Sequence, residues 1–344
     1  MDFTSYLKEA AGEINSYLIS FFNNWLAEVT DISPTLLPLA KTLSDNCGGG
    51  KMLRGSLVKL GYELAGGKNL TEILKPAVAV EIFQTAILAH DDIIDQSPLR
   101  RGKPTIYKQL GGDHYGISQT IALADIGFFL SVKLIAESNF DKDKKNKALS
   151  HFAQTVINTG LGEVLDVELP HIKEDRVDKD VITIHKLKTS YYTIIDPLTL
   201  GAILGGAQEE TLKVIAKFGE NLGIAFQITD DILGVFGDEK TLGKSVTSDI
   251  EEGKNTLLIT YALQQATGAQ KQVLDRYYGQ GKIGEKELEI VRAVFKETGS
   301  LDNSRQEALK YVTQAKAVIP KITQESKYSQ LLSQMADFLV ERDR

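Results

Sequence analysis

Apolar residues recur at intervals of three and four positions along nearly the whole chain, and this spacing constrains the fold more than any other feature. The N-terminal stretch SYLKEAAGEINSYLISFFNNWL shows it clearly, because residues at this spacing share one face of an α-helix. Alternating apolar and polar runs bounded by hairpin turns, which indicate strands, are absent from the sequence. We therefore predict an all-α fold.

Prolines set most of the predicted helix boundaries, because proline disrupts a helix interior. Pro34 and Pro38 predict an early loop, whereas Pro197 falls inside a predicted helix and predicts a kink. The predicted helices cover residues 2–28, 51–66, 72–95, 114–139, 143–169, 179–204, 208–235, 254–266, 268–280, 284–297, 303–318 and 323–341. Since no flexible linker or repeat of solenoid length interrupts them, we expect residues 1–344 to form one single-domain helical bundle.

Composition and charge exclude several classes of protein. The formal net charge of -7 makes nucleic acid a poor first guess for a partner. Cys47 is the only cysteine, so an intramolecular disulfide is impossible and a cytoplasmic location is the default. The N-terminus lacks the basic and then apolar order of a signal peptide. The apolar stretch YGISQTIALADIGFFLSVKL contains Asp125, so we expect a buried core helix and no membrane span.

Two pairs of adjacent aspartates end two apolar helical stretches, HDDIID and TDDILG. In the first, Asp91 and Asp95 are four residues apart and share a helix face, while Asp92 is expected to point about 100° away, at the rim. Carboxylates this close repel one another unless a cation intervenes. Carboxylate ligands without thiolates favour a hard ion such as Mg²⁺, which commonly also binds substrate phosphate. Asp230 and Asp231 repeat the pattern, so two such ends facing across a bundle would make a trinuclear diphosphate clamp.

Basic residues stand beside both acidic motifs. Arg100 and Arg101 follow the first motif in a Pro/Gly loop and suit bidentate phosphate recognition. Lys51 and Arg54 begin a helix behind three glycines, where free backbone N–H groups also favour anions. Lys188 lies in an apolar helical stretch, where a snorkelling surface lysine is an equally good interpretation.

Taken together, these residues resemble the trans-polyprenyl diphosphate synthase family, which includes farnesyl and geranylgeranyl diphosphate synthases. The similarity spans about residues 50 to 260 and rests on an ordered set of motifs: GGKMLRG, EIFQTAILAHDDIIDQSPLRRGKP, GLGEVLDVE, KLKTSYYTIIDPLTLGA and GIAFQITDDILGVFGDEKTLGKSVTSDIEEGKNTLL. The resemblance implies an all-α prenyltransferase fold, a homodimer, and isopentenyl and allylic diphosphates as substrates.

The resemblance also implies a role for each matching residue. Two Mg²⁺ ions would bind Asp91, Asp92 and Asp95. A third would bind Asp230 directly, with Asp231 acting mainly through water. Arg100 would bind the allylic diphosphate; the isopentenyl diphosphate pocket would comprise Lys51, Arg54, Gln84 and Arg101. Contacts to the allylic leaving group or the developing cation are implied for Lys188, Thr189, Gln227 and Lys244, and Lys254 would lie on a closing loop.

Two positions depart from the family pattern. Gly234 stands where many members have a third aspartate in the second motif, which weakens water-mediated support of the metal. Gln84 stands where histidine is frequent, although an amide can still donate to phosphate.

Product length depends on how deep the cavity below the first motif is. Counted along the helix, Ile87 is about 6 Å and Phe83 about 12 Å below Asp91. In the family that the chain resembles, bulk four or five positions before the first aspartate shortens the product, and these positions are Ile87 and Ala86 here. The resemblance therefore implies that Ala86 leaves room for more than a farnesyl tail. Phe83, Phe128 and Phe129 are candidates for the floor, although ordinary core packing is the commoner role of such aromatics. We favour a C20 product, with C15 and C25 or longer open.

The expected mechanism is ionisation of the allylic diphosphate, condensation with isopentenyl diphosphate and loss of a proton, with the departed diphosphate as the base. Two alternatives stay open at this level: a class I terpene cyclase, which shares the DDxxD helix, and a non-catalytic regulatory subunit of a prenyl synthase. The sequence does not decide the primer preference, the pathway, the need for a second subunit or the role of residues 267–344.

Overall fold

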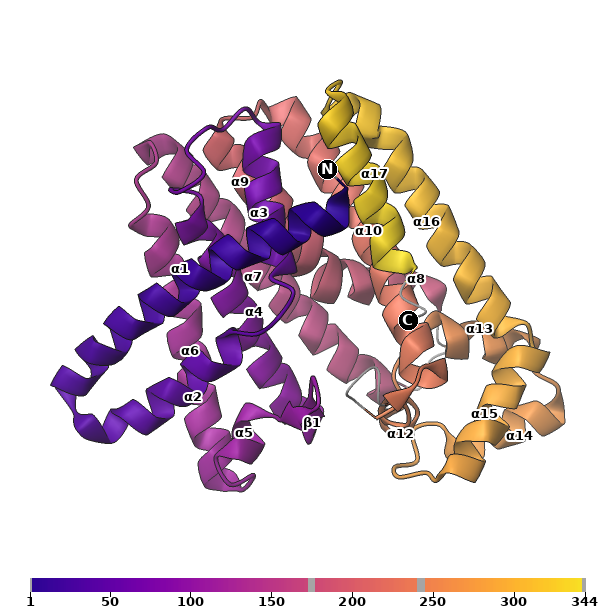
Figure 1. The fold of residues 1–344 in the computed structure, drawn as a ribbon. Coiled ribbons are helices and arrows are strands. Elements are labelled where there is room, and N and C mark those ends of the chain that lie inside the picture. Colours follow the sequence, from indigo (N-terminus) through magenta and orange to yellow (C-terminus); the bar gives the residue numbers. More distant parts are fainter. Residues whose placement is uncertain (1, 173–176, 240–244, 342–344) are drawn as a thin grey trace. The chain divides into compact units, whose positions relative to one another are not determined.

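The computed structural model describes residues 2–172, 177–239 and 245–341, and within them almost all regular structure is helical (Figure 1). The all-α prediction is confirmed. The described elements are α1 (Phe3–Ile32), η1 (Pro34–Leu36), α2 (Leu37–Cys47), α3 (Leu53–Leu64), α4 (Leu74–Ile94), β1 (Leu99–Arg100), β2 (Lys103–Pro104), α5 (Ile106–Gln109), α6 (His114–Ala136), α7 (Lys142–Glu168), η2 (Leu169–His171), α8 (Asp178–Ile184), the π-helix η3 (His185–Ile195), α9 (Asp196–Gly205), α10 (Glu209–Phe236), α12 (Ser248–Glu252), α13 (Leu257–Gln265), α14 (Gly268–Tyr277), α15 (Glu285–Glu297), α16 (Ser300–Ile322) and α17 (Ser326–Val340).

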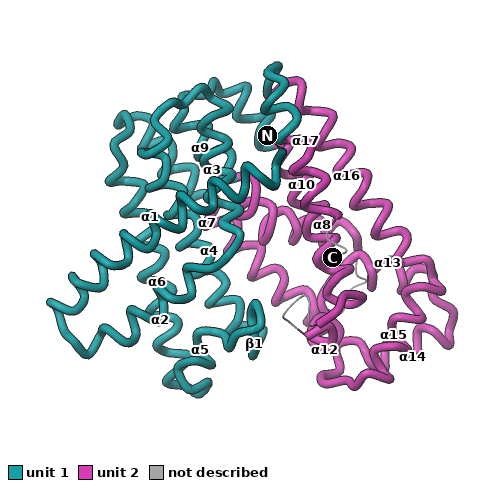
Figure 2. Tube along the Cα trace, viewed as in Figure 1, with its two compact units in different colours: residues 1–154, 196–216, 323–331 teal, residues 155–195, 217–322, 332–344 magenta. Residues whose placement is uncertain are grey.

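The described chain forms two compact units (Figure 2). Unit 1 comprises residues 1–154, 196–216 and 323–331, and unit 2 comprises residues 155–195, 217–322 and 332–344. Each unit therefore takes segments that lie far apart in the sequence. The single-domain organisation of residues 1–344 stays a prediction.

Unit 1 is built around α3, α4, α6 and α9, and small residues allow these helices to approach closely. A Cβ on Gly61 of α3 would overlap the carbonyl of Leu198 on α9, and a Cβ on Gly201 of α9 would overlap the carbonyl of Val58 on α3. Gly127 of α6 lies against Ala86 of α4, where an added Cβ would come within 2.9 Å of the Ala86 Cβ. Close backbone approach therefore fixes α4, the helix that carries the first acidic motif.

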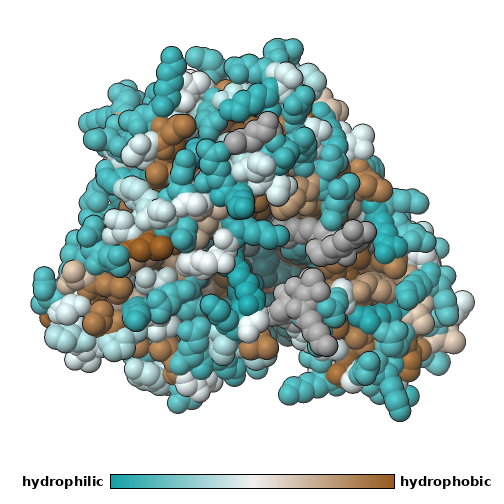
Figure 3. All heavy atoms as spheres, viewed as in Figure 1, coloured by the Kyte–Doolittle hydropathy of each residue, from teal (hydrophilic) through white to brown (hydrophobic). Residues whose placement is uncertain are grey.

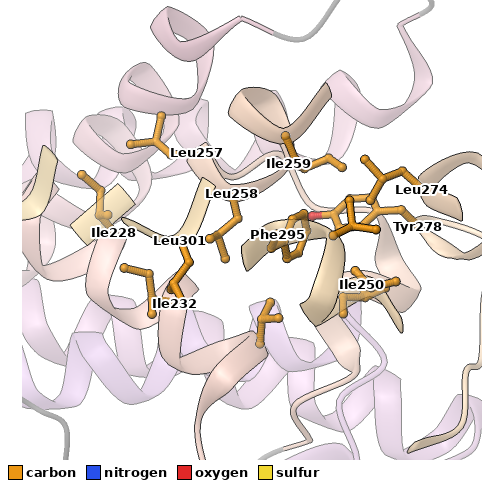
Figure 4. Packing of buried hydrophobic residues seen from close by; sticks show 14 of the residues in the cluster. Ile228, Ile232, Ile250, Leu257, Leu258, Ile259, Leu274, Tyr278, Phe295 and Leu301 are labelled. Atoms are coloured by element: carbon orange, nitrogen blue, oxygen red, sulfur yellow. The ribbon is translucent and has the colours of Figure 1, made fainter. Parts of the chain in front are cut away.

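Unit 2 has its own apolar core between α10, α12, α13, α14, α15 and α16 (Figure 4). Ile228 and Ile232 of α10 pack into the same buried cluster as Leu258 of α13, Phe295 of α15 and Leu301 of α16. Phe295 is fully buried and meets Tyr278 edge to face, with the ring centroids 6.3 Å apart. This core fixes one face of α10, the helix that carries the second acidic motif.

Side-chain caps account for several helix starts. Asp2 accepts a hydrogen bond from the Ser5 N–H at 2.8 Å at the start of α1, and Asp113 accepts from the Gly116 N–H at 3.1 Å at the start of α6. Helix α3 differs because Met52, its N-cap residue, has a left-handed backbone (φ 46°) and offers no side-chain cap. The first turn of α3 therefore needs a hydrogen-bond acceptor from elsewhere in the chain.

Two sequence predictions about local structure were wrong. Pro34 and Pro38 start η1 and α2, because proline is tolerated in the first turn of a helix. The predicted helix 179–204, by contrast, is confirmed as a continuous helical stretch, which changes type where the π-helix His185–Ile195 lies between α8 and α9. The basic loop forms a short hairpin, in which Leu99 pairs with Pro104 and Arg100 with Lys103.

Helix α6 has one buried and one exposed apolar face. By length and composition alone it could cross a membrane, and 44% of its most apolar 18-residue window is buried inside the structure. On the face of the molecule shown in Figure 3, hydrophilic side chains predominate and apolar ones lie scattered among them. The exposed apolar residues of α6 recur instead at helical spacing: Tyr115, Ile121, Ile126, Phe129 and Val132. Phe129 is 73% exposed, so the expectation that it forms part of an internal floor was wrong for this chain.

Candidate active site

The first acidic motif occupies the C-terminal end of α4 in unit 1. Asp91 and Asp95 have carboxylate oxygens within 4.8 Å of one another, as their spacing of four residues predicts. Asp92 was expected at the rim, but its carboxylate is buried and only 3% of the residue is exposed. Burial raises the pKa of Asp92 to about 6, although the neighbouring guanidinium of Arg100 opposes this rise.

Arg100 is held by both adjacent aspartates. Its Nε donates to Asp92 Oδ1 at 2.8 Å, and its Nη2 donates to Asp91 Oδ2 at 2.8 Å. The chain reverses directly after α4, where Gln96 has a φ of 52° and the Ser97 N–H donates to the Asp92 carbonyl at 2.9 Å. The turn residues of the hairpin that follows, Arg101 and Gly102, have φ values of 54° and 73°. This reversal brings Arg100 back to the end of α4, so the sequence prediction that acids and arginines lie together is confirmed for Arg100.

The predicted isopentenyl diphosphate residues also lie in unit 1. Arg54 and Gln84 are buried, at 8% exposure each, whereas Lys51 and Arg101 are exposed. Gly50, directly before Lys51, lies beneath the Arg101 guanidinium, because an added Cβ would come within 2.9 Å of Arg101 Nη1. The glycine-rich segment therefore brings Arg101 next to the start of α3, which sequence order alone did not establish.

Glu81 is a buried acid at this place that the sequence analysis missed. It is 5% exposed, and its Oε1 accepts a hydrogen bond from the Gly55 N–H at 2.7 Å. The N–H groups that the sequence offered as anion donors at the start of α3 are thus partly used by the protein itself. The signal was present as a lone carboxylate in the otherwise apolar stretch VAVEIFQTAILA.

The second acidic motif lies on α10 in unit 2 and belongs to a hydrogen-bonded chain of side chains. Thr189 Oγ1 donates to Gln227 Oε1 at 2.7 Å, and Gln227 Nε2 donates to Asp231 Oδ1 at 2.7 Å. His185 Nε2 lies 2.9 Å from the other oxygen, Asp231 Oδ2, and His185 is only 3% exposed. The structure therefore brings together three of the predicted site residues, and it adds His185, which the sequence analysis did not consider.

Lys188 projects from the π-helix toward two acids of α7. Its Nζ lies 2.9 Å from Glu163 Oε2 and 2.7 Å from Asp166 Oδ2, and its side chain is 18% exposed. The snorkelling interpretation of Lys188 was therefore wrong. Both acids come from the motif GLGEVLDVE. Its second glycine, Gly162, lets the backbone of α7 touch the π-helix.

Two further predicted residues follow α10. Lys254 lies 3.3 Å from Glu252 Oε2, and the Tyr278 hydroxyl donates to its backbone carbonyl at 2.6 Å. Lys244 lies outside the described residues.

The candidate chain-length residues extend down α4 from Asp91. Phe83 is 1% exposed and meets two rings, that of Phe128 at a centroid distance of 5.7 Å and that of Phe152 at 5.1 Å. Ile87 is half-buried. Ala86 is fully buried against Gly127, so its small side chain serves the contact between α4 and α6.

Comparison with known proteins decides the family. The polyprenyl synthetase family matches residues 38–297 of this chain. The chain belongs to the polyprenyl synthetase family. It is a trans-prenyltransferase, a polyprenyl diphosphate synthase.

Relatives of this synthase make products of different length. It is 29% identical to the geranylgeranyl diphosphate synthase of Sulfolobus acidocaldarius, covering 99% of this chain and 98% of the relative. It is 32% identical to the geranylfarnesyl diphosphate synthase of Aeropyrum pernix, covering 86% and 91%. The fold matches a crystal structure of the Corynebacterium glutamicum geranylgeranyl pyrophosphate synthase in complex with isoprenyl diphosphate and magnesium, with a TM-score of 0.91, 24% identity and full coverage of both chains.

The predicted site residues of this synthase divide between its two units. Unit 1 holds Asp91, Asp92, Asp95, Arg100, Arg101, Lys51, Arg54, Gln84, Phe83, Ala86 and Ile87; unit 2 holds Asp230, Asp231, Lys188, Thr189, Gln227 and Lys254. The convergence of the two acidic helix ends on one diphosphate, and the individual role of each residue, stay predictions.

Proposed function

We propose that this synthase condenses isopentenyl diphosphate with an allylic diphosphate to give the C20 product geranylgeranyl diphosphate. The observation that carries the chain length is the aromatic cluster of Phe83, Phe128 and Phe152, which lies about 12 Å, or two helical turns, below Asp91. The S. acidocaldarius relative, named for the C20 product, supports this length. The A. pernix relative, of similar identity and named for a longer product, makes C25 the alternative.

The proposed diphosphate contacts follow from the cationic side chains of unit 1. Arg100, held at the end of α4 by two aspartates, presents a planar fork that suits the allylic diphosphate. The second group would bind isopentenyl diphosphate and comprises the cations Arg54, Arg101 and Lys51 together with the neutral amide of Gln84. Separate cationic groups for the two diphosphates suit a reaction that joins two substrates.

The carboxylates of unit 1 fit Mg²⁺. Asp91 and Asp95 place oxygens within 4.8 Å of each other, and oxygen-only donors favour a hard divalent ion that also binds phosphate. We infer that Asp91, Asp92 and Asp95 hold two Mg²⁺ and that Asp230, supported by Asp231, holds a third. The bound ions would neutralise charge on the allylic diphosphate as its C–O bond breaks.

The residues of unit 2 suit stabilisation of the resulting allylic cation. Gln227 Oε1 accepts from the Thr189 hydroxyl, so the carbonyl dipole and the hydroxyl are oriented before substrate arrives. Lys188 is fixed by Glu163 and Asp166 and would contact the departing diphosphate. Since no other base is assigned, we propose that this diphosphate accepts the proton lost after condensation.

We also propose that the synthase is a homodimer and acts in the cytoplasm. The exposed apolar row on α6 supports the dimer, because exposed apolar side chains gathered on one helix face, here around the exposed Asp125, often mark an interface.

Product analysis tests the proposed function. Purified protein is incubated with Mg²⁺, isopentenyl diphosphate and, in turn, dimethylallyl, geranyl, farnesyl or geranylgeranyl diphosphate, and the products are measured by mass spectrometry. We expect a C20 product from the three shorter primers and little extension of the C20 primer. Extension of the C20 primer to C25 would favour the longer product, and absence of extension from every primer would contradict the proposal.

A further inference from the structure

The first turn of α3 carries Arg54 but has no cap of its own. Met52 offers no side-chain oxygen, so the early N–H groups of α3 would be left without acceptors. The acceptor comes from α4, where Glu81 Oε1 binds the Gly55 N–H at 2.7 Å. A carboxylate supplied by a neighbouring helix thus replaces the usual N-cap side chain.

Gly55 makes this contact possible. An added Cβ would come within 2.9 Å of the Ala77 carbonyl oxygen and 3.3 Å of the Glu81 Cγ. The absence of a side chain at residue 55 therefore lets α3 lie directly on α4 at the level of Glu81.

The carboxylate of Glu81 also lies within range of the positive charges of Arg54 and Arg101. Burial raises its pKa, and the Gly55 N–H together with the charges of Arg54 and Arg101 opposes that rise. A buried acid without such partners would be strongly destabilising. Its carboxylate therefore belongs to the start of α3, next to the residue that carries the buried guanidinium of Arg54.

We propose that Glu81 is a positioning residue for the isopentenyl diphosphate pocket, because its buried carboxylate caps the first turn of α3, which carries Arg54. This inference rests on the proposed function. Glu81 binds the backbone at the start of α3, so it acts on the substrate only through the residues that it positions.

The test compares affinity for the two substrates. Glu81→Gln keeps an oxygen for the Gly55 N–H but removes the negative charge that acts on Arg54 and Arg101. We expect its Kd for isopentenyl diphosphate, measured by calorimetry on the full chain, to rise at least tenfold. The KM for this substrate should rise in parallel, while the KM for the allylic diphosphate stays within about threefold. Glu81→Asp, which keeps the charge but shortens the side chain, should show the same selectivity and serves if the first variant folds poorly.

Glu13→Gln is the matched control. Glu13 of α1 forms an ion pair with the buried Lys59 of α3, so its loss removes a charged contact to the same helix away from the arginines. It should lower Tm without changing the ratio of the two KM values.

Three outcomes would decide against the inference: a Kd within twofold of the wild type in both Glu81 variants, an equal rise of both KM values accompanied by a fall in Tm, or a wild-type chain that does not bind isopentenyl diphosphate. A wild-type chain that extends no primer, yet binds isopentenyl diphosphate in a manner that depends on Glu81, would contradict the proposed function and leave the inference standing.

Discussion

Gly162 of α7 lies directly against the backbone of Lys188 in the π-helix, so close that a Cβ on Gly162 would overlap the Lys188 backbone nitrogen. On another side of the π-helix, a Cβ on Gly223 of α10 would come within 2.5 Å of Ser190 Cβ. Two glycines thus let neighbouring helices hold the widened turn that presents Lys188 and Thr189. π-Helical turns are frequent at functional sites, and here the packing around one is visible.

Gly162→Ala should therefore displace Lys188. We expect a loss of about 1 to 3 kcal/mol in the free energy of unfolding, as for other overpacked sites. We also expect kcat to fall at least tenfold, because the lysine loses its place between Glu163 and Asp166. Denaturant unfolding and steady-state kinetics measure the two effects, and Gly160→Ala, where an added Cβ meets open space, is the control. Equal behaviour of the two variants would contradict the packing argument.

Phe83→Ala should lengthen the products. Removing the ring opens space between Phe128 and Phe152, two turns below Asp91, into which a longer prenyl chain can extend. We expect C25 or longer products in mass spectra, with stability reduced by about 3 to 5 kcal/mol. Phe22→Ala, which removes another buried phenylalanine in unit 1, on α1, should destabilise the protein without lengthening the product. An unchanged product from Phe83→Ala would show that this ring is not the floor.

Arg100→Lys should impair use of the allylic substrate. A lysine ammonium cannot reproduce the fork that contacts Asp91 and Asp92 together. We expect kcat/KM for the allylic diphosphate to fall about a hundredfold, equivalent to about 2.7 kcal/mol. Lys103→Gln, at the exposed position paired with Arg100 in the hairpin, is the control and should remain within about threefold of the wild type. Full activity of Arg100→Lys would show that simultaneous contact of residue 100 with Asp91 and Asp92 is not needed for activity.

Cys47 should be unreactive while the chain is folded. It is 4% exposed, and burial raises the pKa of its thiol to about 12, with only a partial offset from a hydrogen bond involving Thr85. At pH 8 the native protein should react with iodoacetamide at least about a hundredfold more slowly than the protein unfolded in urea, because the thiolate is the nucleophile.

The raised pKa of the Cys47 thiol also predicts how the free energy of unfolding depends on pH. The folded thiol has a higher pKa than the unfolded thiol, whose ordinary value is 9.0. The stabilisation from keeping the thiol protonated is therefore complete below pH 9 and is lost as the pH rises from 9 toward 12. In Cys47→Ser, the free energy of unfolding should fall less at alkaline pH than in the wild type. Urea titrations at several pH values measure this difference. Fast alkylation of the native protein would contradict the burial of Cys47.

Phe129→Asp should separate the proposed dimer. The charge would enter the centre of the apolar row on α6, where Phe129 is 73% exposed in the single chain. We expect light scattering after size exclusion to show a dimer for the wild type and a monomer for the variant. Ile19→Asp, at another exposed apolar position on α1, should leave the dimer intact. A monomeric wild type would contradict the proposal directly.

Local pattern was sufficient for the fold class and for much of the candidate site. Helical spacing predicted most of the helices, and the spacing of four between Asp91 and Asp95 predicted that their carboxylates converge, because both are properties of a single helix. The adjacency of Arg100 to the acids also followed from chain order. The resemblance of the ordered motifs then led to the family, which the comparisons confirmed.

Contacts between segments that lie far apart in the sequence decided the rest. Ala86 of α4 is small because Gly127 of α6 packs against it. Glu81 caps a helix that begins 28 residues earlier in the chain, at Leu53, and His185 reaches Asp231 from another helix. The periodicity of one helix carries no information about which neighbour lies against it. These partners are set by close packing in three dimensions, and only the tertiary structure shows them.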